Sequence, residues 1–67
     1  MNWQIVKGNW NQFKGRIQQE WGELTDDDLD RIKGQRDILL GRLQEKYGIT
    51  EKEADVRIHS WERGLRD

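Results

Sequence analysis

Two groups of polar side chains in this 67-residue chain have residue types suited to metal or acid–base chemistry. The first is the acidic run DDDLD at residues 26–30, whose carboxylates could bind a divalent cation. An EF-hand loop counted from Asp26 needs Gly at its sixth position and Glu at its twelfth, where this chain has Arg31 and Asp37. Because carboxylates also stabilise the first turn of a helix, we interpret the run as the start of a helix.

The second group is His59 with its neighbour Ser60. A catalytic or metal-binding histidine needs partners, and this chain contains no Cys and no other His. Adjacent residues of a helix point in different directions, so Ser60 cannot face His59. The sequence therefore predicts no catalytic residue, no metal ligand, no cofactor and no small-molecule substrate, which is the pattern of a protein that is not an enzyme.

A third group of polar residues could contact phosphates. Residues 31–48 carry five basic and two acidic side chains, whereas the whole chain has 12 basic and 13 acidic residues. Nucleic-acid-binding domains are usually strongly basic, so we do not favour nucleic acid as a partner. Weak binding of this kind would use the four basic residues Arg31, Lys33, Arg42 and Lys46.

Glycines recur every seven residues in two series, Gly8, Gly15 and Gly22, then Gly34, Gly41 and Gly48. A spacing of seven returns to nearly the same helix face, which here lies opposite the apolar residues. Glycine within a helix costs up to about 1 kcal/mol relative to Ala. One explanation is a surface formed by Gly34, Ile38 and Gly41 that a partner or a second copy approaches closely. The other is that low stability is tolerated or useful.

Apolar residues with helical spacing predict where the helices lie. The expected ranges are about 3–21, 26–33, 35–47 and 51–65. Thr25 and Thr50, each with an acid three residues later, are expected to cap helix N-termini, and Gly22 and Gly48 to close the preceding helices in the left-handed conformation. Residues 26–47 could form one helix or two, and we favour a kink or break near Gly34.

Four tryptophans occur in the chain, and three of them, Trp10, Trp21 and Trp61, lie on the apolar faces of these helices. We expect these three side chains to form the core rather than to bind a ligand. Trp3 would be an exposed contact residue only if the first helix did not reach it.

An internal repeat relates the two halves of the chain. Residues 7–22 (KGNWNQFKGRIQQEWG) align without gaps on residues 33–48 (KGQRDILLGRLQEKYG), with six identical positions. The repeat predicts two helical hairpins related by pseudo-symmetry. We expect a single all-α domain over residues 1–67, a compact orthogonal bundle of about four short helices.

The composition excludes several classes of protein. Hydrophobic residues make up 33% of the chain and charged residues 37%, and no apolar run approaches the roughly 20 residues of a membrane span. Without cysteines there is no disulfide framework, and no signal-peptide core follows Met1. We therefore expect a soluble cytoplasmic protein.

Three segments, GNWNQFKG at 8–15, WGELTDDD at 21–28 and GRLQEKYG at 41–48, resemble the CsbD-like family of small bacterial proteins. The resemblance extends from about Lys7 to Trp61, and the second segment is its most specific part. It implies an all-α, SAM-like arrangement of about four helices and abundance under general or osmotic stress. It implies no enzymatic activity and supplies no functional residues.

These observations lead to a functional hypothesis with two alternatives. The hypothesis is a non-enzymatic stress-response protein, similar in composition to the hydrophilins that protect cells during water loss. The alternatives are a protein-interaction or self-association module and a weak nucleic-acid-binding domain. The binding partner and the inducing stress stay open.

Overall fold

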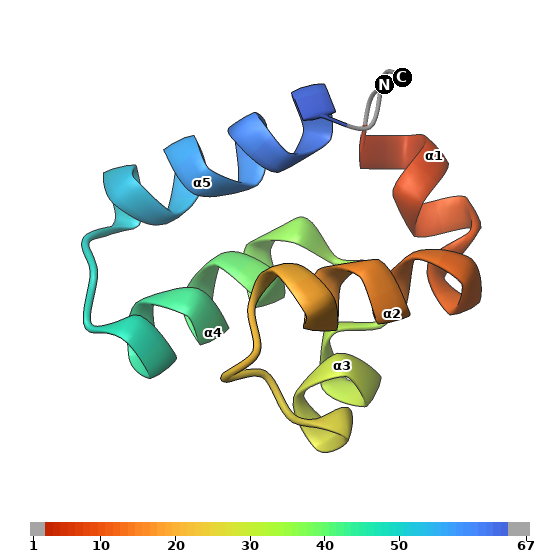
Figure 1. Cartoon of the computed structure of the whole chain (residues 1–67), viewed down its shortest axis with the longest axis horizontal. Helices are drawn as coiled ribbons and strands as arrows, with labels where there is room; N and C mark the ends of the chain where they lie inside the picture. The colour runs from red at the N-terminus through yellow and green to blue at the C-terminus, as the bar shows by residue number, and fades with distance from the viewer. Residues whose placement is uncertain (1–2, 65–67) are drawn as a thin grey trace.

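The computed structural model describes residues 3–64, which form five helices and no strand. The chain order is α1 (Trp3–Gly8), α2 (Trp10–Glu20), α3 (Asp26–Ile32), α4 (Arg36–Tyr47) and α5 (Glu51–Gly64). Helices α4 and α5 pack together as a hairpin, while α3 packs on α4 and α1 on α2 (Figure 1). The prediction of an all-α fold is confirmed.

The core lies between these helices and takes residues from all of them. Its fully or almost fully buried apolar members are Val6, Ile17, Trp21, Leu24, Leu29, Ile32, Leu39, Leu43, Ala54 and Ile58. Every helix contributes at least one of them, and the turn between α2 and α3 adds Trp21 and Leu24. Burial of these faces stabilises a chain in which few residues are apolar.

The first predicted helix, residues 3–21, is two helices that meet at Asn9, so the bundle has five helices where about four were expected. Asn9 leaves the helical conformation, with φ −121° and ψ 39°, and its side-chain amide donates to the carbonyl of Ile5 at 3.0 Å. The bend places Trp3 against the second half of the chain, where its indole Nε1 donates to the carbonyl of Gly34 at 2.7 Å.

Residues 26–47 form two helices, as the favoured interpretation predicted. The break occurs at Lys33 and Gly34, which both have positive φ, 47° and 82°. The helix that follows starts one residue later than expected, at Arg36, and the preceding one ends one residue earlier, at Ile32. The left-handed pair turns the chain so that α3 packs back on α4.

The predicted caps are confirmed at Thr25, Thr50 and Gly48, but the prediction for Gly22 is wrong. Gly48 has φ 62° and ends α4, whereas Gly22 does not have a positive φ. Helix α2 ends instead at Glu20, and its C-cap residue Trp21 is neither helical nor left-handed, with φ −122° and ψ 84°. Burial of the Trp21 side chain at this point fixes the end of the helix, so the following glycine is not needed for it. The predicted end of the last helix, residue 65, lies outside the described residues.

Trp61 of α5 is the centre of an aromatic cluster that ties both ends of the described chain together. Its ring centroid lies 6.1 Å from that of Trp3, 6.3 Å from that of Phe13 and 5.9 Å from that of Trp21. Trp21 is buried, and Trp10 and Trp61 are half-buried and packed against the core. Trp3 lies within α1 and also packs on the core, so it is not an isolated exposed aromatic residue.

Candidate functional site

The acidic run begins α3, and its most important carboxylate is the buried one. The Thr25 hydroxyl accepts a hydrogen bond from the Asp28 backbone N–H at 3.1 Å, and the Asp28 carboxylate accepts one from the Thr25 N–H at 3.0 Å. Only 5% of Asp28 is exposed. Across from it on α4, Lys46 Nζ lies 3.3 Å from one carboxylate oxygen and Arg42 Nε 3.7 Å from the other. Asp28 therefore links the start of α3 to α4.

The surroundings of Asp28 favour its charged form. The hydrogen bond from the Thr25 backbone N–H is the main cause that lowers the pKa of this carboxyl below its ordinary value. Burial opposes this effect, while Lys46 and the Thr25 side chain add to it. An aspartate that its neighbours hold in the charged form in this way has a structural role. Within residues 3–64, no group of three or more acidic or histidine side chains could hold a metal ion.

The four basic residues predicted to contact phosphates do not form one cationic face. Arg42 and Lys46 share Asp28, and Arg42 also lies 3.6 Å from Glu45. Arg31 pairs with Asp27 at 3.1 Å along α3. Lys33 is exposed at the left-handed turn and forms no ion pair within residues 3–64. Acidic partners thus offset three of the four positive charges.

The three residues predicted to form an interaction surface are separated by the structure. Gly34 is buried, and a Cβ atom there would lie 3.1 Å from the Lys7 Cα and 3.3 Å from the Lys7 carbonyl oxygen. The close approach expected at this glycine is therefore made within the chain, by α1. Gly41 has open space where a Cβ would be, and Ile38 is half-buried against the core.

Arg36 forms a contact between helices that sequence reasoning did not predict. From the start of α4, its guanidinium lies 2.7 Å from an Asp55 oxygen and 3.5 Å from a Glu62 oxygen, both on α5. The two acids are seven residues apart, so they share one face of α5. In the sequence, Arg36 stands on an otherwise apolar helix face. A charged residue in such a position indicates an ion pair at the edge of a core.

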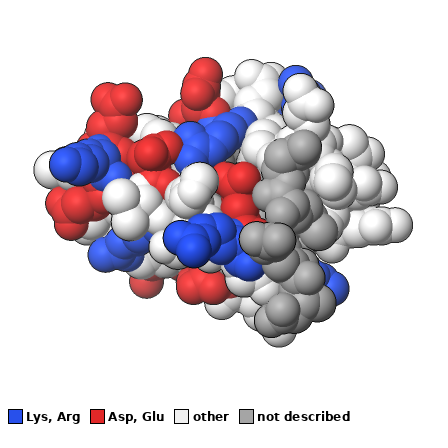
Figure 2. All heavy atoms as spheres, turned by 90° about the horizontal axis from the view of Figure 1, so that it is seen from above, with Lys and Arg blue, Asp and Glu red and all other residues white. Residues whose placement is uncertain are grey.

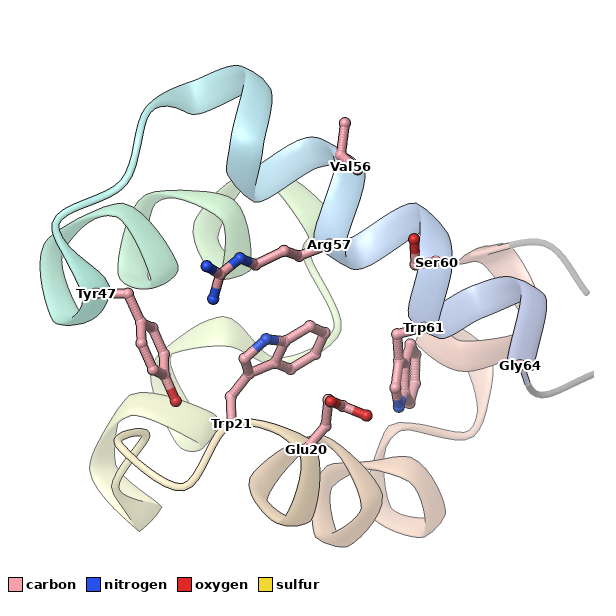
Figure 3. A pocket seen from close by; sticks show the side chains of 8 residues that line it. All are labelled: Glu20, Trp21, Tyr47, Val56, Arg57, Ser60, Trp61 and Gly64. Atoms are coloured by element: carbon pink, nitrogen blue, oxygen red, sulfur yellow. The ribbon is translucent and has the colours of Figure 1, made fainter.

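A surface hollow lined by three aromatic side chains lies between α5 and the ends of α2 and α4. We call it the aromatic groove; its volume is about 560 Å³, and it is lined by Glu20, Trp21, Tyr47, Val56, Arg57, Ser60, Trp61 and Gly64 (Figure 3). Sequence analysis predicted no such groove, because it placed both tryptophans wholly in the core. His59 is exposed and does not line the groove.

Opposite charges enter the aromatic groove from two helices. The Arg57 guanidinium of α5 extends over the Tyr47 ring, 5.8 Å from its centroid, and Glu20 at the end of α2 lines the same groove as the two tryptophans (Figure 3). The Tyr47 hydroxyl accepts a hydrogen bond from the Glu23 backbone N–H at 3.3 Å, which holds that ring in place. The described residues that line the groove thus combine aromatic rings with one cation and one anion.

Comparison with known proteins identifies the family of this small helical domain. A model of the CsbD-like family matches residues 4–55. The chain belongs to the CsbD-like family. That range contains α2, α3 and α4 in full together with the Lys-Gly and Thr-acid positions of the repeat, and it ends within α5. The resemblance inferred from the three sequence segments is confirmed.

Relatives of this CsbD-like chain cover almost its whole length. The UPF0337 protein ECA0631 of Pectobacterium atrosepticum is 50% identical over 62 residues, which are 92% of this chain and 90% of the relative. The UPF0337 protein YjbJ of Escherichia coli K12 is 47% identical over the same shares of both chains. The UPF0337 protein XAC4007 of Xanthomonas axonopodis pv. citri is 43% identical over 67 residues, 100% of this chain and 97% of the relative. Family membership places the CsbD-like chain among stress-response proteins.

The described helices of the CsbD-like chain are also short. None of those within residues 3–64 has the length and apolar character needed to cross a membrane.

Proposed function

We propose that this CsbD-like chain is a non-enzymatic, soluble cytoplasmic protein of the general or osmotic stress response that protects other macromolecules during water loss. The observation that carries the proposal is the mixed charge of its surface. Figure 2 shows Lys and Arg side chains lying among Asp and Glu side chains on the face that includes α5. Such a surface holds water strongly and interacts weakly with many partners rather than strongly with one.

Ion pairs at the surface support this proposal. Arg31 pairs with Asp27, and both of these side chains are largely exposed. Arg36 pairs with Asp55, of which the aspartate is the more exposed. Exposed pairs contribute only about 0–1 kcal/mol each to stability, so their partners can exchange with solvent or with another macromolecule. The charged groups are therefore available for weak contacts without loss of the fold.

Two glycines within helices point to low stability as a further property of the protectant. A Cβ at Gly15 of α2 or at Gly41 of α4 would meet no atom within 4 Å. Neither position therefore needs glycine for packing, and each costs up to about 1 kcal/mol relative to Ala. A marginally stable domain can loosen as water is removed and can then cover a larger area of a partner.

The proposal is tested by drying a labile enzyme, such as lactate dehydrogenase, with and without the protein and measuring the activity that survives rehydration. Higher recovery is expected with this chain than with an unrelated helical protein of equal size and net charge. Equal recovery with both proteins would contradict a specific protective role.

The double variant Gly15→Ala with Gly41→Ala separates the two properties. It keeps every charged side chain but is expected to be more stable. Protection that is unchanged in this variant assigns the effect to the charged surface alone. A fall in protection shows that low stability contributes as well.

Self-association is a second candidate function, supported by the open space at Gly41 beside half-buried Ile38 on α4. The surface is smaller than predicted because Gly34 is covered by Lys7. Sedimentation velocity at rising concentration tests it, with Gly41→Leu as the blocking variant. A chain that stays monomeric at millimolar concentration, with or without the substitution, would rule this function out.

Weak nucleic-acid binding has less support, because Arg42 and Lys46 would have to leave the buried carboxylate of Asp28 to reach a phosphate. Binding of this kind would fall steeply with salt. An absence of binding to a fluorescent oligonucleotide at low ionic strength would remove this alternative.

A further inference from the structure

The indole N–H of Trp21 is a hydrogen-bond donor without a partner in the part of the chain that the structure describes. Trp3 donates its indole N–H to the Gly34 carbonyl at 2.7 Å, and Trp10 donates its own to the Leu29 carbonyl at 3.3 Å. Trp21 is only 4% exposed, yet no bond from its nitrogen to residues 3–64 is found. Indole N–H groups of buried tryptophans usually find a partner, so an acceptor for this one must come from outside the described residues, as solvent or as a ligand.

The aromatic groove is where that acceptor would lie. No fully buried side-chain nitrogen or oxygen of the described residues lacks a hydrogen bond, so the Trp21 nitrogen must reach the surface. Figure 3 shows it facing into the groove on the side of Arg57. Two hydrogen-bond donors, an indole N–H and a guanidinium, therefore face the same space from different elements.

Arg57 is available to bind an anion. Among residues 3–64 its guanidinium contacts the Tyr47 ring and forms no ion pair with a carboxylate. A guanidinium donates in a planar fork that matches the two oxygens of a carboxylate. Because the Trp21 N–H faces the same groove, the two residues together can offer a carboxylate group three donors.

Glu20 restricts which carboxylates fit. It lines the same groove and, within the described chain, makes no ion pair, so its negative charge repels a simple anion. A ligand that also carries a cation turns this repulsion into attraction. The rings of Trp21 and Trp61 beside Glu20 favour a weakly hydrated, alkylated ammonium over a strongly hydrated one.

We propose that the aromatic groove binds a compact zwitterion, with its carboxylate at Arg57 and the Trp21 N–H and its alkylated ammonium beside Glu20 and Trp61. The groove volume of about 560 Å³ is ample for a molecule of this class. Because the groove is open to solvent on one side, the dissociation constant is expected in the range of about 1–10 mM. The proposal stands on these contacts and does not depend on the protective function proposed above.

The test is a titration of the ¹⁵N-labelled chain with glycine betaine, followed through the four indole N–H signals in NMR spectra. The Trp21 signal is expected to shift and to saturate in the low millimolar range. The signals of Trp3 and Trp10, which are already bonded to carbonyl groups, are expected to stay in place. A Trp21 signal that does not move by 50 mM, or four signals that drift together without saturation, would overturn the proposal.

Three variants test the roles of the charged residues. Arg57→Gln is expected to weaken betaine binding at least tenfold, while Arg63→Gln, an exposed residue of α5 outside the groove, leaves it unchanged. Glu20→Gln is expected to weaken betaine binding but to strengthen binding of propionate, which has a carboxylate and no cation. Equal betaine affinity in all three variants would contradict the assignment. If Arg57→Gln unfolds the chain by circular dichroism, Arg57→Lys takes its place, since it keeps the charge and removes the planar fork.

Discussion

The dipeptide Lys-Gly occurs at aligned positions in the two halves of the repeat, at residues 7–8 and 33–34, and the two copies have different conformations. Gly8 is the last residue of α1, has no positive φ, and would have open space around a Cβ. Gly34 has φ 82°, is buried, and lies against the backbone of Lys7. The first Lys-Gly thus packs on the second, and only the second depends on its glycine.

The capped turns that follow the two halves differ in the same way. Thr25 and Asp28 form one capping box, and Thr50 and Glu53 form the other, with both backbone N–H groups bonded in each case. Asp28 is buried beside two cations of α4, whereas Glu53 is exposed and its side chain, among the described residues, bonds only to Thr50. Similar local sequences therefore start a helix in both places, but only the first also joins two helices.

These differences show which information is local and which is not. The cap residues fix where a helix begins, because their hydrogen bonds are made within four residues. Whether the same residues also support the fold depends on which element packs over them. In this chain α1 covers the second Lys-Gly and α4 covers the first capping box, so both important contacts join one half of the repeat to the other.

The largest expected effect follows from Gly34→Ala. An alanine there has to adopt a positive φ and also places its Cβ 3.1 Å from the Lys7 Cα, so we expect a loss of about 3 kcal/mol in the free energy of unfolding. Gly8→Ala, at the aligned position, is expected to be neutral or slightly stabilising because nothing lies within 4 Å. Urea unfolding of both variants measures the difference. Equal changes in the free energy of unfolding would show that the two Lys-Gly dipeptides have equivalent roles.

Asp28→Asn is expected to have the next largest effect, a loss of about 2 kcal/mol. The substitution weakens the cap and leaves Arg42 and Lys46 without their shared carboxylate. Glu53→Gln at the other capped turn removes only an exposed contact and is expected to cost less than about 0.5 kcal/mol. Thermal unfolding at neutral pH compares them, and a larger loss for Glu53→Gln would contradict the distinction between the two turns.

The same carboxylate predicts how stability depends on pH. The pKa of Asp28 is lowered by folding, chiefly through the Thr25 backbone N–H, so the unfolded chain takes up the proton at higher pH than the folded one. The stabilisation that the ionised Asp28 carboxyl gives to the folded chain is therefore complete above the unfolded pKa, near 3.9. It is lost as the pH falls through the lower pKa of the folded chain. Melting temperatures between pH 6 and pH 2 are expected to fall less in Asp28→Asn than in the unchanged chain. Parallel curves would show that other carboxyls dominate acid unfolding.

Much of the fold could be predicted from the sequence because its signals are local. Apolar spacing located the helices, and Thr25 and Thr50 marked two of their N-termini. The division at Asn9 was missed because the apolar stripe continues through it. The bend there accompanies a distant contact, the bond from Trp3 to the carbonyl of Gly34, and apolar spacing does not contain that information.

The surface was less predictable for the same reason. Helical spacing placed Gly34 on an outer face, but the left-handed turn moved it off the helix and under Lys7. Spacing also indicated that Trp21 and Trp61 pack inside, which they do, without revealing that one edge of each borders a groove. The ion-pair partners of Arg36, Arg42 and Lys46 depend on how α4 packs against α5 and α3, and the periodicity of the sequence does not determine this packing.

A smaller effect, of opposite sign, is expected at the one pair of aligned glycines at which the two halves agree. Gly15 of α2 and Gly41 of α4 both lie within helices and have open space where a Cβ would be. Alanine at either position lowers the conformational entropy of the unfolded chain without creating a clash, so each substitution is expected to add about 0.5–1 kcal/mol to the free energy of unfolding. The effects should add in the double variant, because the two sites lie on different helices and share no contact within 4 Å. If Gly41→Ala destabilises the chain while Gly15→Ala stabilises it, the α4 face must be occupied by something that approaches closely. A second copy of the chain would then be the first candidate, and a concentration-dependent melting temperature would identify it.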